Sequence, residues 1–163
     1  MDVGGGDSRL VDHLLARGAA CVAVLDISRA ALERARHRLG GDASRVRWLV
    51  ADVTGDWQVQ PVDIWHDRAV FHFLTEAGDR ARYLAHLRQA VPIGGHVIIA
   101  TFALDGPERC SGLPVARYSA ETLAAQLGSG FALLETLNER HLTPAGTTQS
   151  FCWTLFRRSA KPE

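Results

Sequence analysis

The chain has 163 residues, and its 18 lysines and arginines balance its 18 aspartates and glutamates. This length predicts one domain with a sizeable core, and balanced charge without a block of one sign does not support nucleic-acid binding through bulk electrostatics. The chain has no apolar run of membrane-spanning length, and its three cysteines are widely spaced without a C-x-x-C, so we expect a cytoplasmic protein that binds no membrane.

A glycine-rich loop opens the chain, at Asp2-Val3-Gly4-Gly5-Gly6-Asp7-Ser8. The amphipathic run that follows predicts a helix, for which Ser8 is a natural N-cap and Gly18 a stop. Glycines let the backbone turn sharply and let a ligand approach where a Cβ would collide. A tight turn without any ligand is the alternative interpretation of this loop.

An apolar strand over residues 21–25 follows and ends at Asp26, about twenty residues beyond the glycines. An acid at this place can accept hydrogen bonds from both hydroxyls of a nucleotide-type ribose. An ordinary cap at the end of a strand is the alternative role of Asp26.

Strands and helices alternate along the rest of the chain, which predicts an α/β sheet covered on both faces. We expect further strands over 46–50, about 62–65 and 96–101, and a closing antiparallel hairpin of 131–139 and 149–157. Helices are expected over 29–39, about 80–90, and from Ser119 to about 127. The longest irregular segment, 102–117, has a length that often carries function in compact domains.

The spacing of Asp2, Gly4 and Gly6 resembles motif I, D-x-G-x-G-x-G, of the class I S-adenosylmethionine-dependent methyltransferases, with Ser8 at the last glycine position. The dinucleotide fingerprint counted from Gly4 would place its third glycine at Arg9, so a nicotinamide dehydrogenase is disfavoured. The resemblance covers essentially the whole chain, and it is also carried by Leu25-Asp26-Ile27, Ala51-Asp52-Val53, the stretch after Asp63, and Pro92–Gly95.

The fold that the resemblance implies is α/β, a Rossmann-like, doubly wound and mostly parallel sheet with a C-terminal antiparallel hairpin. Residues 1–163 would form a single S-adenosylmethionine-binding domain. The chain departs from the family's pattern in one respect, because only Met1 precedes Asp2 where a full strand is the rule. We therefore expect a truncated first strand and an open cofactor cleft, with a homodimer as one way to cover the exposed apolar surface.

The resemblance implies S-adenosylmethionine as the cofactor and S-adenosylhomocysteine as the product. The glycines would pass beside the amino-acid half, Asp26 would accept from the ribose, and Asp52 would accept from the adenine amino group while Val53 offers a backbone N–H. The implied cofactor-binding residues are Asp2, Gly4, Gly5, Gly6, Ser8, Asp26, Ile27, Asp52 and Val53.

The triplet His66-Asp67-Arg68 follows the fourth predicted strand and, in the implied fold, faces the methyl group. His66 could take a proton from an acceptor, since its unperturbed pKa of roughly 6.5 suits neutral pH, and Asp67 could orient it or hold a cationic substrate. We assign Arg68, with Arg109 and Cys110 of the long loop, to the substrate. A local salt bridge and a merely buried cysteine are the alternatives.

The sequence gives no support for a metal site, because His66, Asp67 and His72 lack a metal-binding spacing. The Asn/Asp-Pro-Pro-aromatic motif of amino-group methyltransferases acting on nucleobases and glutamine is absent at residues 66–69, so that acceptor class is not expected.

Three functions remain open. Methyl transfer to a small-molecule acceptor by direct displacement is favoured by the compact size and neutral charge. Protein-lysine methylation uses the same fold, and the short first strand makes a non-catalytic cofactor-binding module the third candidate. No motif indicates which atom accepts the methyl group.

Overall fold

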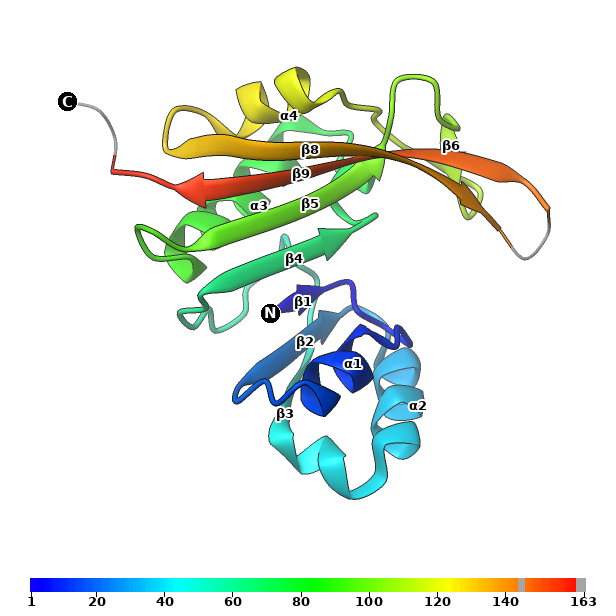
Figure 1. Cartoon of the computed structure of the whole chain (residues 1–163), viewed down its shortest axis with the longest axis vertical. Helices are drawn as coiled ribbons and strands as arrows, with labels where there is room; N and C mark the ends of the chain where they lie inside the picture. The colour runs from blue at the N-terminus through cyan, green and yellow to red at the C-terminus, as the bar shows by residue number, and fades with distance from the viewer. Residues whose placement is uncertain (144–145, 161–163) are drawn as a thin grey trace.

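The computed structural model describes residues 1–143 and 146–160. One sheet contains the strands β1 (Asp2–Val3), β2 (Val22–Asp26), β3 (Val46–Val50), β4 (Ile64–Arg68), β5 (His96–Phe102), β8 (Phe131–Leu142) and β9 (Thr148–Arg158). Their order is β3-β2-β1-β4-β5-β9-β8 (Figure 1). Strands β1 to β5 are parallel, and the hairpin of β8 and β9 lies antiparallel to β5. The predicted Rossmann-like sheet, its C-terminal hairpin and its short first strand are confirmed.

Different helices cover the two faces of this sheet. Helices α1 (Leu10–Ala16) and α2 (Arg29–Leu39) form one core with β2 and β3, which includes Val11, Leu32 and Val24. Helices α3 (Ala77–Ala90) and α4 (Ala120–Leu127) form the other core, which includes Trp65 and Leu25. Successive residues of a strand point to opposite faces, so Val24 and Leu25 of β2 serve different cores.

Strand β4 is displaced from its predicted position, because it spans Ile64–Arg68 rather than about 62–65. The triplet His66-Asp67-Arg68 is therefore part of the strand, and the prediction that it follows the strand was wrong. The polar residues do not end the strand, since Asp67 finds its hydrogen-bond partners inside the core.

Helices α2 and α4 begin at capping serines. Ser28 accepts from Ala31 N, and Ser119 forms a capping box with Thr122. Helix α1 instead has Arg9 in the N-cap position, although the Ser8 hydroxyl accepts from Leu10 N at 3.1 Å. Within the long irregular segment, β6 (Arg109–Cys110) and β7 (Leu113–Pro114) form a small antiparallel pair.

Candidate functional site

Three loops meet at the C-terminal ends of β1, β2 and β3. Gly4 N and Gly5 N donate to the carbonyl of Leu25 at 2.7 and 3.3 Å, which fixes the glycine loop on the end of β2. Ala51 N donates to the carbonyl of Asp26 at 3.1 Å, so the loop after β3 joins the same edge. Open α/β sheets bind their ligands at this edge.

The glycine loop leaves no room for side chains. Gly4 and Gly6 have φ values of 67° and 45°, in the left-handed region that favours glycine. A Cβ on Gly4 would overlap the side chain of Val70, and a Cβ on Gly5 would lie 2.6 Å from Asp2 Oδ2. A Cβ on Gly6 would lie 3.0 Å from Asp26 Oδ2. Bare backbone therefore lies directly beside the Asp26 carboxylate.

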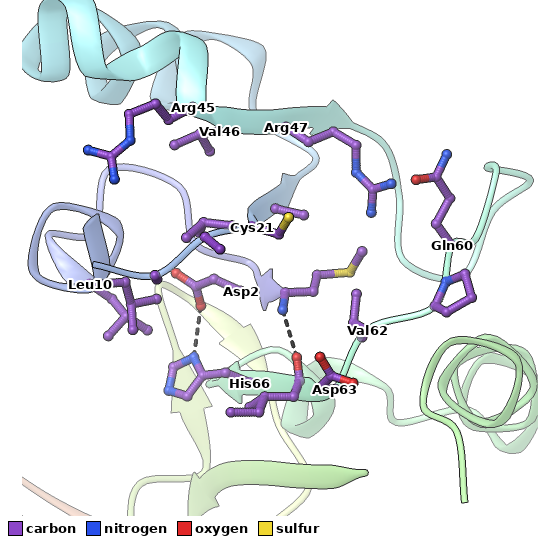
Figure 2. A pocket seen from close by; sticks show the side chains of 18 of the residues that line it. Asp2, Leu10, Cys21, Arg45, Val46, Arg47, Gln60, Val62, Asp63 and His66 are labelled. Carbon is purple, nitrogen blue, oxygen red and sulfur yellow. Dashed lines mark hydrogen bonds and ion pairs between the residues drawn. The ribbon is translucent and has the colours of Figure 1, made fainter. Parts of the chain in front are cut away.

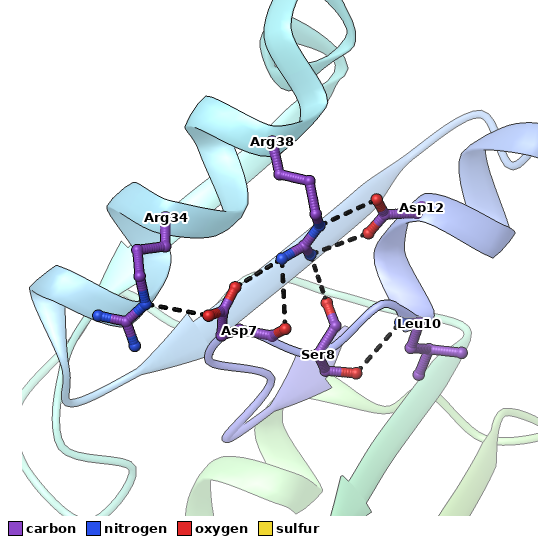
Figure 3. A network of polar contacts seen from close by, with 6 residues as sticks. All are labelled: Asp7, Ser8, Leu10, Asp12, Arg34 and Arg38. Atoms are coloured by element: carbon purple, nitrogen blue, oxygen red, sulfur yellow. Dashed lines mark hydrogen bonds and ion pairs between the residues drawn. The ribbon is translucent and has the colours of Figure 1, made fainter.

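Ion pairs anchor the far end of this loop to α2 (Figure 3). Arg38 binds Asp7 through one nitrogen and forms a two-point contact with Asp12, at 3.1 and 2.9 Å. Arg38 also donates to the carbonyl of Ser8 at 2.8 Å, and Arg34 binds Asp7 at 2.9 Å. The hydrogen bond with Arg38 lowers the pKa of Asp12. The loop is thus held from both ends, by Leu25 and by α2.

The predicted ribose and adenine residues lie at this edge, and the Oδ2 atoms of Asp26 and Asp52 accept no hydrogen bond from the part of the chain that the structure describes. Asp26 Oδ1 accepts from Ser28 N at 2.7 Å, whereas Oδ2 faces Gly6. Asp52 Oδ1 accepts from the backbone N and the hydroxyl of Thr54, both at 2.8 Å. Ile27 is 72% exposed, an open apolar surface beside Asp26. The glycines, Asp26, Ile27 and Asp52 are therefore brought together.

Two members of the predicted cofactor set are buried beneath the edge. Val53 belongs to the core, and its carbonyl accepts from His86 Nδ1 at 2.8 Å. Asp2 is 4% exposed, and its Oδ1 pairs with His66 Nδ1 at 2.8 Å (Figure 2). The Oδ2 atom of Asp2 lies beside Gly5, so Asp2 packs against the glycine loop.

His66 does not lie beyond the end of β4. It is opposite Asp2 in the sheet and lines a cavity with the first residues of β2, β3 and β4, at the other end of β1 from the glycine loop. The interpretation of His66 as a base facing the methyl group is therefore corrected, because the register turns its side chain to Asp2.

Asp67 is fully buried and its hydrogen-bond partners belong to the protein. Its carboxylate accepts from the Tyr83 hydroxyl at 2.6 Å, from Val70 N at 2.9 Å and from Phe71 N at 3.1 Å. Tyr83 in turn accepts from Trp65 Nε1 at 2.8 Å. Burial raises the pKa of Asp67 to about 6. Asp67 holds the turn after β4 rather than a substrate.

The residues assigned to the substrate are only partly brought together. The Arg68 guanidinium lies 4.9 Å from the ring centre of Phe151, and Cys110 packs on the apolar cluster that includes Phe151. Arg109 donates to the carbonyl of Gly112 at 2.6 and 3.2 Å, so it stabilises its own short hairpin.

Sequence reasoning missed Val70, Arg38 and Tyr83. Val70 touches the glycine loop because Ala69, with φ of 68°, turns the chain sharply after β4. The sequence did contain a signal for Arg38, because Arg34 and Arg38 are four residues apart and therefore lie on one side of α2.

His72 is buried among aromatic side chains. Its ring contacts Phe73 and Phe102, and burial lowers its pKa to about 4. In residues 1–143 and 146–160 there is no group of three His, Cys, Asp or Glu side chains placed to hold a metal ion. Among the helices described, none has the length and apolar character needed to cross a membrane.

Residues 1–97 match the family model of a methyltransferase domain. The fold is similar to that of 1,6-didemethyltoxoflavin-N1-methyltransferase from Burkholderia thailandensis, solved with 1,6-didemethyltoxoflavin and S-adenosylhomocysteine. The TM-score is 0.77 at 20% identity, over 98% of this chain and 70% of that one.

N-methyltransferase NodS from Bradyrhizobium japonicum, in complex with S-adenosylhomocysteine, gives a TM-score of 0.74 at 16% identity, over 98% of this chain and 76% of that one. An S-adenosylmethionine-dependent methyltransferase from Mesorhizobium loti gives a TM-score of 0.74 at 21% identity, over 96% of this chain and 89% of that one. A search of the curated proteins gave no significant match.

Proposed function

The chain belongs to the methyltransferase domain family and has the fold of the class I S-adenosylmethionine-dependent enzymes, and from this premise we propose that it methylates a small molecule. The observation that carries the proposal is the glycine loop, whose bare backbone lies beside the free oxygen of Asp26. The small-molecule acceptor is supported by the Burkholderia relative, which was solved with 1,6-didemethyltoxoflavin.

The residues at the edge fit S-adenosylmethionine part by part. Gly4, Gly5 and Gly6 give the amino-acid half a surface that any Cβ would fill. Asp26 Oδ2 would accept from the ribose hydroxyls, since Oδ1 is already engaged with Ser28. Ile27 would offer the adenine ring an apolar surface, and the second oxygen of Asp52 would accept from the adenine amino group.

The protein contributes alignment to the reaction. When bound, the cofactor supplies a methyl group that its sulfonium has already activated for direct displacement. Alignment of donor and acceptor can contribute roughly 7–11 kcal/mol. Val70 is held against Gly4 by the Asp67 network, and Arg68, Cys110 and Phe151 form the neighbouring surface that we assign to the acceptor. We assign no side chain as base, because His66 is engaged by Asp2.

The three cysteines at positions 21, 110 and 152 are free, which supports the proposed cytoplasmic location.

Calorimetry with S-adenosylhomocysteine tests the cofactor site. Asp26→Ala should weaken binding by about 5- to 150-fold, because loss of the acceptor leaves buried ribose donors unpaired at a cost of about 1–3 kcal/mol. Asp42→Ala is the matched control, since Asp42 is exposed and, among residues 1–143 and 146–160, forms its ion pair with Arg45 alone. Equal affinities of the two variants would refute the ribose assignment, and stabilisation by NAD but not by S-adenosylhomocysteine would refute the cofactor.

A further inference from the structure

Strand β8 lies at one edge of the 7-stranded sheet, next to β9 (Figure 1). Among residues 1–143 and 146–160, no strand pairs with its other side. It is 12 residues long, and after the bulge between Leu133 and Glu135 its pairing with β9 is regular as far as Leu142. Proline and short length are two devices that block such an edge, and residues 135–142 have neither. This run is therefore a template for another strand.

Alternate residues of the run turn their backbone groups outward. In an antiparallel pair, facing residues alternate between exchanging two hydrogen bonds and exchanging none. Thr143 N donates to the carbonyl of Thr147 at 2.8 Å, so the odd-numbered residues of the run are the ones that bond to β9. Ser150, which faces Arg140, accepts from Ala103 N at 2.9 Å on the other side of β9. The N–H and C=O groups of the even-numbered residues from 136 to 142 therefore point away from β9.

We propose that this edge pairs with the same edge of a second copy of the chain, antiparallel, about a two-fold axis that passes through Asn138. Asn138 exchanges both hydrogen bonds with Asn138 of the second copy, and Thr136 does so with Arg140 of that copy. These three residues are exposed, so the second strand reaches them without displacing any part of the chain that the structure describes. The two sheets then form one continuous sheet, as in other recognition by strand addition.

Charge excludes the neighbouring registers. The axis must pass through a residue position, because an axis between two positions would set an outward residue against an inward one. With the axis at Leu137, Glu135 would face Glu139 of the second copy. With the axis at Glu139 or at Arg140, that residue would face its own copy. Facing like charges destabilise a strand pair.

The register through Asn138 gives every charged residue of the run a compatible neighbour. Glu135 faces His141 of the second copy, which can donate a hydrogen bond to its carboxylate. Arg140 faces Thr136, and Glu139 faces a leucine. A strand that matches its own reverse in this way fits a second copy of the chain better than an unrelated strand.

A pair of substitutions at Thr136 tests the interface. Sedimentation velocity of the full chain should show a monomer–dimer equilibrium that shifts with concentration. Thr136→Arg places a like charge opposite Arg140 of the second copy and should weaken the dimer about 2- to 30-fold, whereas Thr136→Glu should strengthen it by a similar factor. A monomer at every concentration, or the same change in both variants, overturns the proposal.

Cross-linking tests the position of the axis. In the proposed register the Cα atoms of the two residues 138 lie about 5.5 Å apart, whereas those of the two residues 136 lie roughly 14 Å apart. A short bis-maleimide should therefore link Asn138→Cys into a covalent dimer and link Thr136→Cys far less. Both variants keep the native cysteines at positions 21, 110 and 152, so their background is the same. Equal cross-linking of the two variants overturns the register.

Discussion

Asp67 and His72 are fully buried titratable residues with opposite pKa shifts. Burial raises the pKa of Asp67 from 3.8 to about 6 and lowers the pKa of His72 from 6.5 to about 4. The contribution of Asp67 to the free energy of unfolding is fully present below pH 4 and is lost as pH rises through about 6. The contribution of His72 is fully present above pH 6.5 and is lost as pH falls through about 4. Between pH 4 and pH 6.5 the two contributions to the free energy of unfolding therefore change in opposite directions.

Replacing His72 by a residue that does not titrate should remove the opposing contribution, so that the variant shows the pH dependence of stability that Asp67 causes. His72→Asn keeps an acceptor near Phe102 N but does not titrate. The difference in free energy of unfolding between wild type and variant should grow from pH 4 to pH 6.5, by at most about 3 kcal/mol, because the pKa of His72 is lowered from 6.5 to about 4. Urea unfolding across this range measures it, and parallel stability curves would contradict the prediction.

Tyr83 links two buried polar groups, and its loss should be costly. Tyr83→Phe leaves Trp65 Nε1 without its acceptor and Asp67 without one donor, so we expect a loss of about 1–3 kcal/mol in unfolding free energy. Tyr118→Phe is the matched control, since the Tyr118 hydroxyl forms no hydrogen bond to the described residues and the ring is similarly buried. Similar losses for both variants would show that packing, not the hydroxyl, explains the effect.

The glycine loop and α2 form a unit at the scale of elements. Arg38→Met removes the contacts to Asp7, Asp12 and the Ser8 carbonyl, and frees the end of the glycine loop, which we propose to bind the cofactor. We expect affinity for S-adenosylhomocysteine to fall about 3- to 10-fold with less than about 1 kcal/mol of lost stability, because such partly exposed ion pairs stabilise weakly.

The control for this prediction is Arg36→Met, an exposed arginine on the same helix. If Arg38→Met lost stability but kept its affinity for the cofactor, the ion pairs would be structural supports of α2 only.

Local signals were sufficient where an element carries its own boundaries. Helix α2 begins after Ser28 and ends before Gly40, and both its limits were predicted correctly. Strand β4 was misplaced because its polar residues have distant partners, since His66 meets Asp2 64 positions away and Asp67 meets Tyr83 16 positions away. No local pattern contains such contacts.

The candidate site also contains some features that local sequence predicts and others that depend on contacts between distant residues. The glycines and Asp26 are close in sequence and follow a known spacing, so their convergence at one edge could be predicted. The contact of Val70 with Gly4 depends on the turn that Asp67 holds after β4, and the clamp by Arg38 depends on how α2 packs.

At the scale of the whole molecule, the sheet consists of two parts joined by a two-residue strand. Strands β2 and β3 form one part and pack on α1 and α2 through one face, and β4, β5, β9 and β8 form the other; the core of α3 and α4 lies under both parts, since it includes Leu25 of β2. In the strand order, β1 alone lies between β2 and β4 (Figure 1). Its residue Asp2 touches Gly5 at one end and His66, on the wall of the cavity, at the other.

This arrangement predicts unequal stability of the two parts. The part with β2 and β3 should open at a lower free energy than the part with β5 and β9, because a short strand provides little pairing between them. Hydrogen exchange followed by mass spectrometry should show faster exchange in residues 22–26 and 46–50 than in 96–102 and 151–156. S-adenosylhomocysteine should slow exchange mainly in the first set, because its proposed contacts lie on the loops after β1, β2 and β3. Uniform exchange across the sheet would show instead that β1 joins the two parts into one cooperative unit.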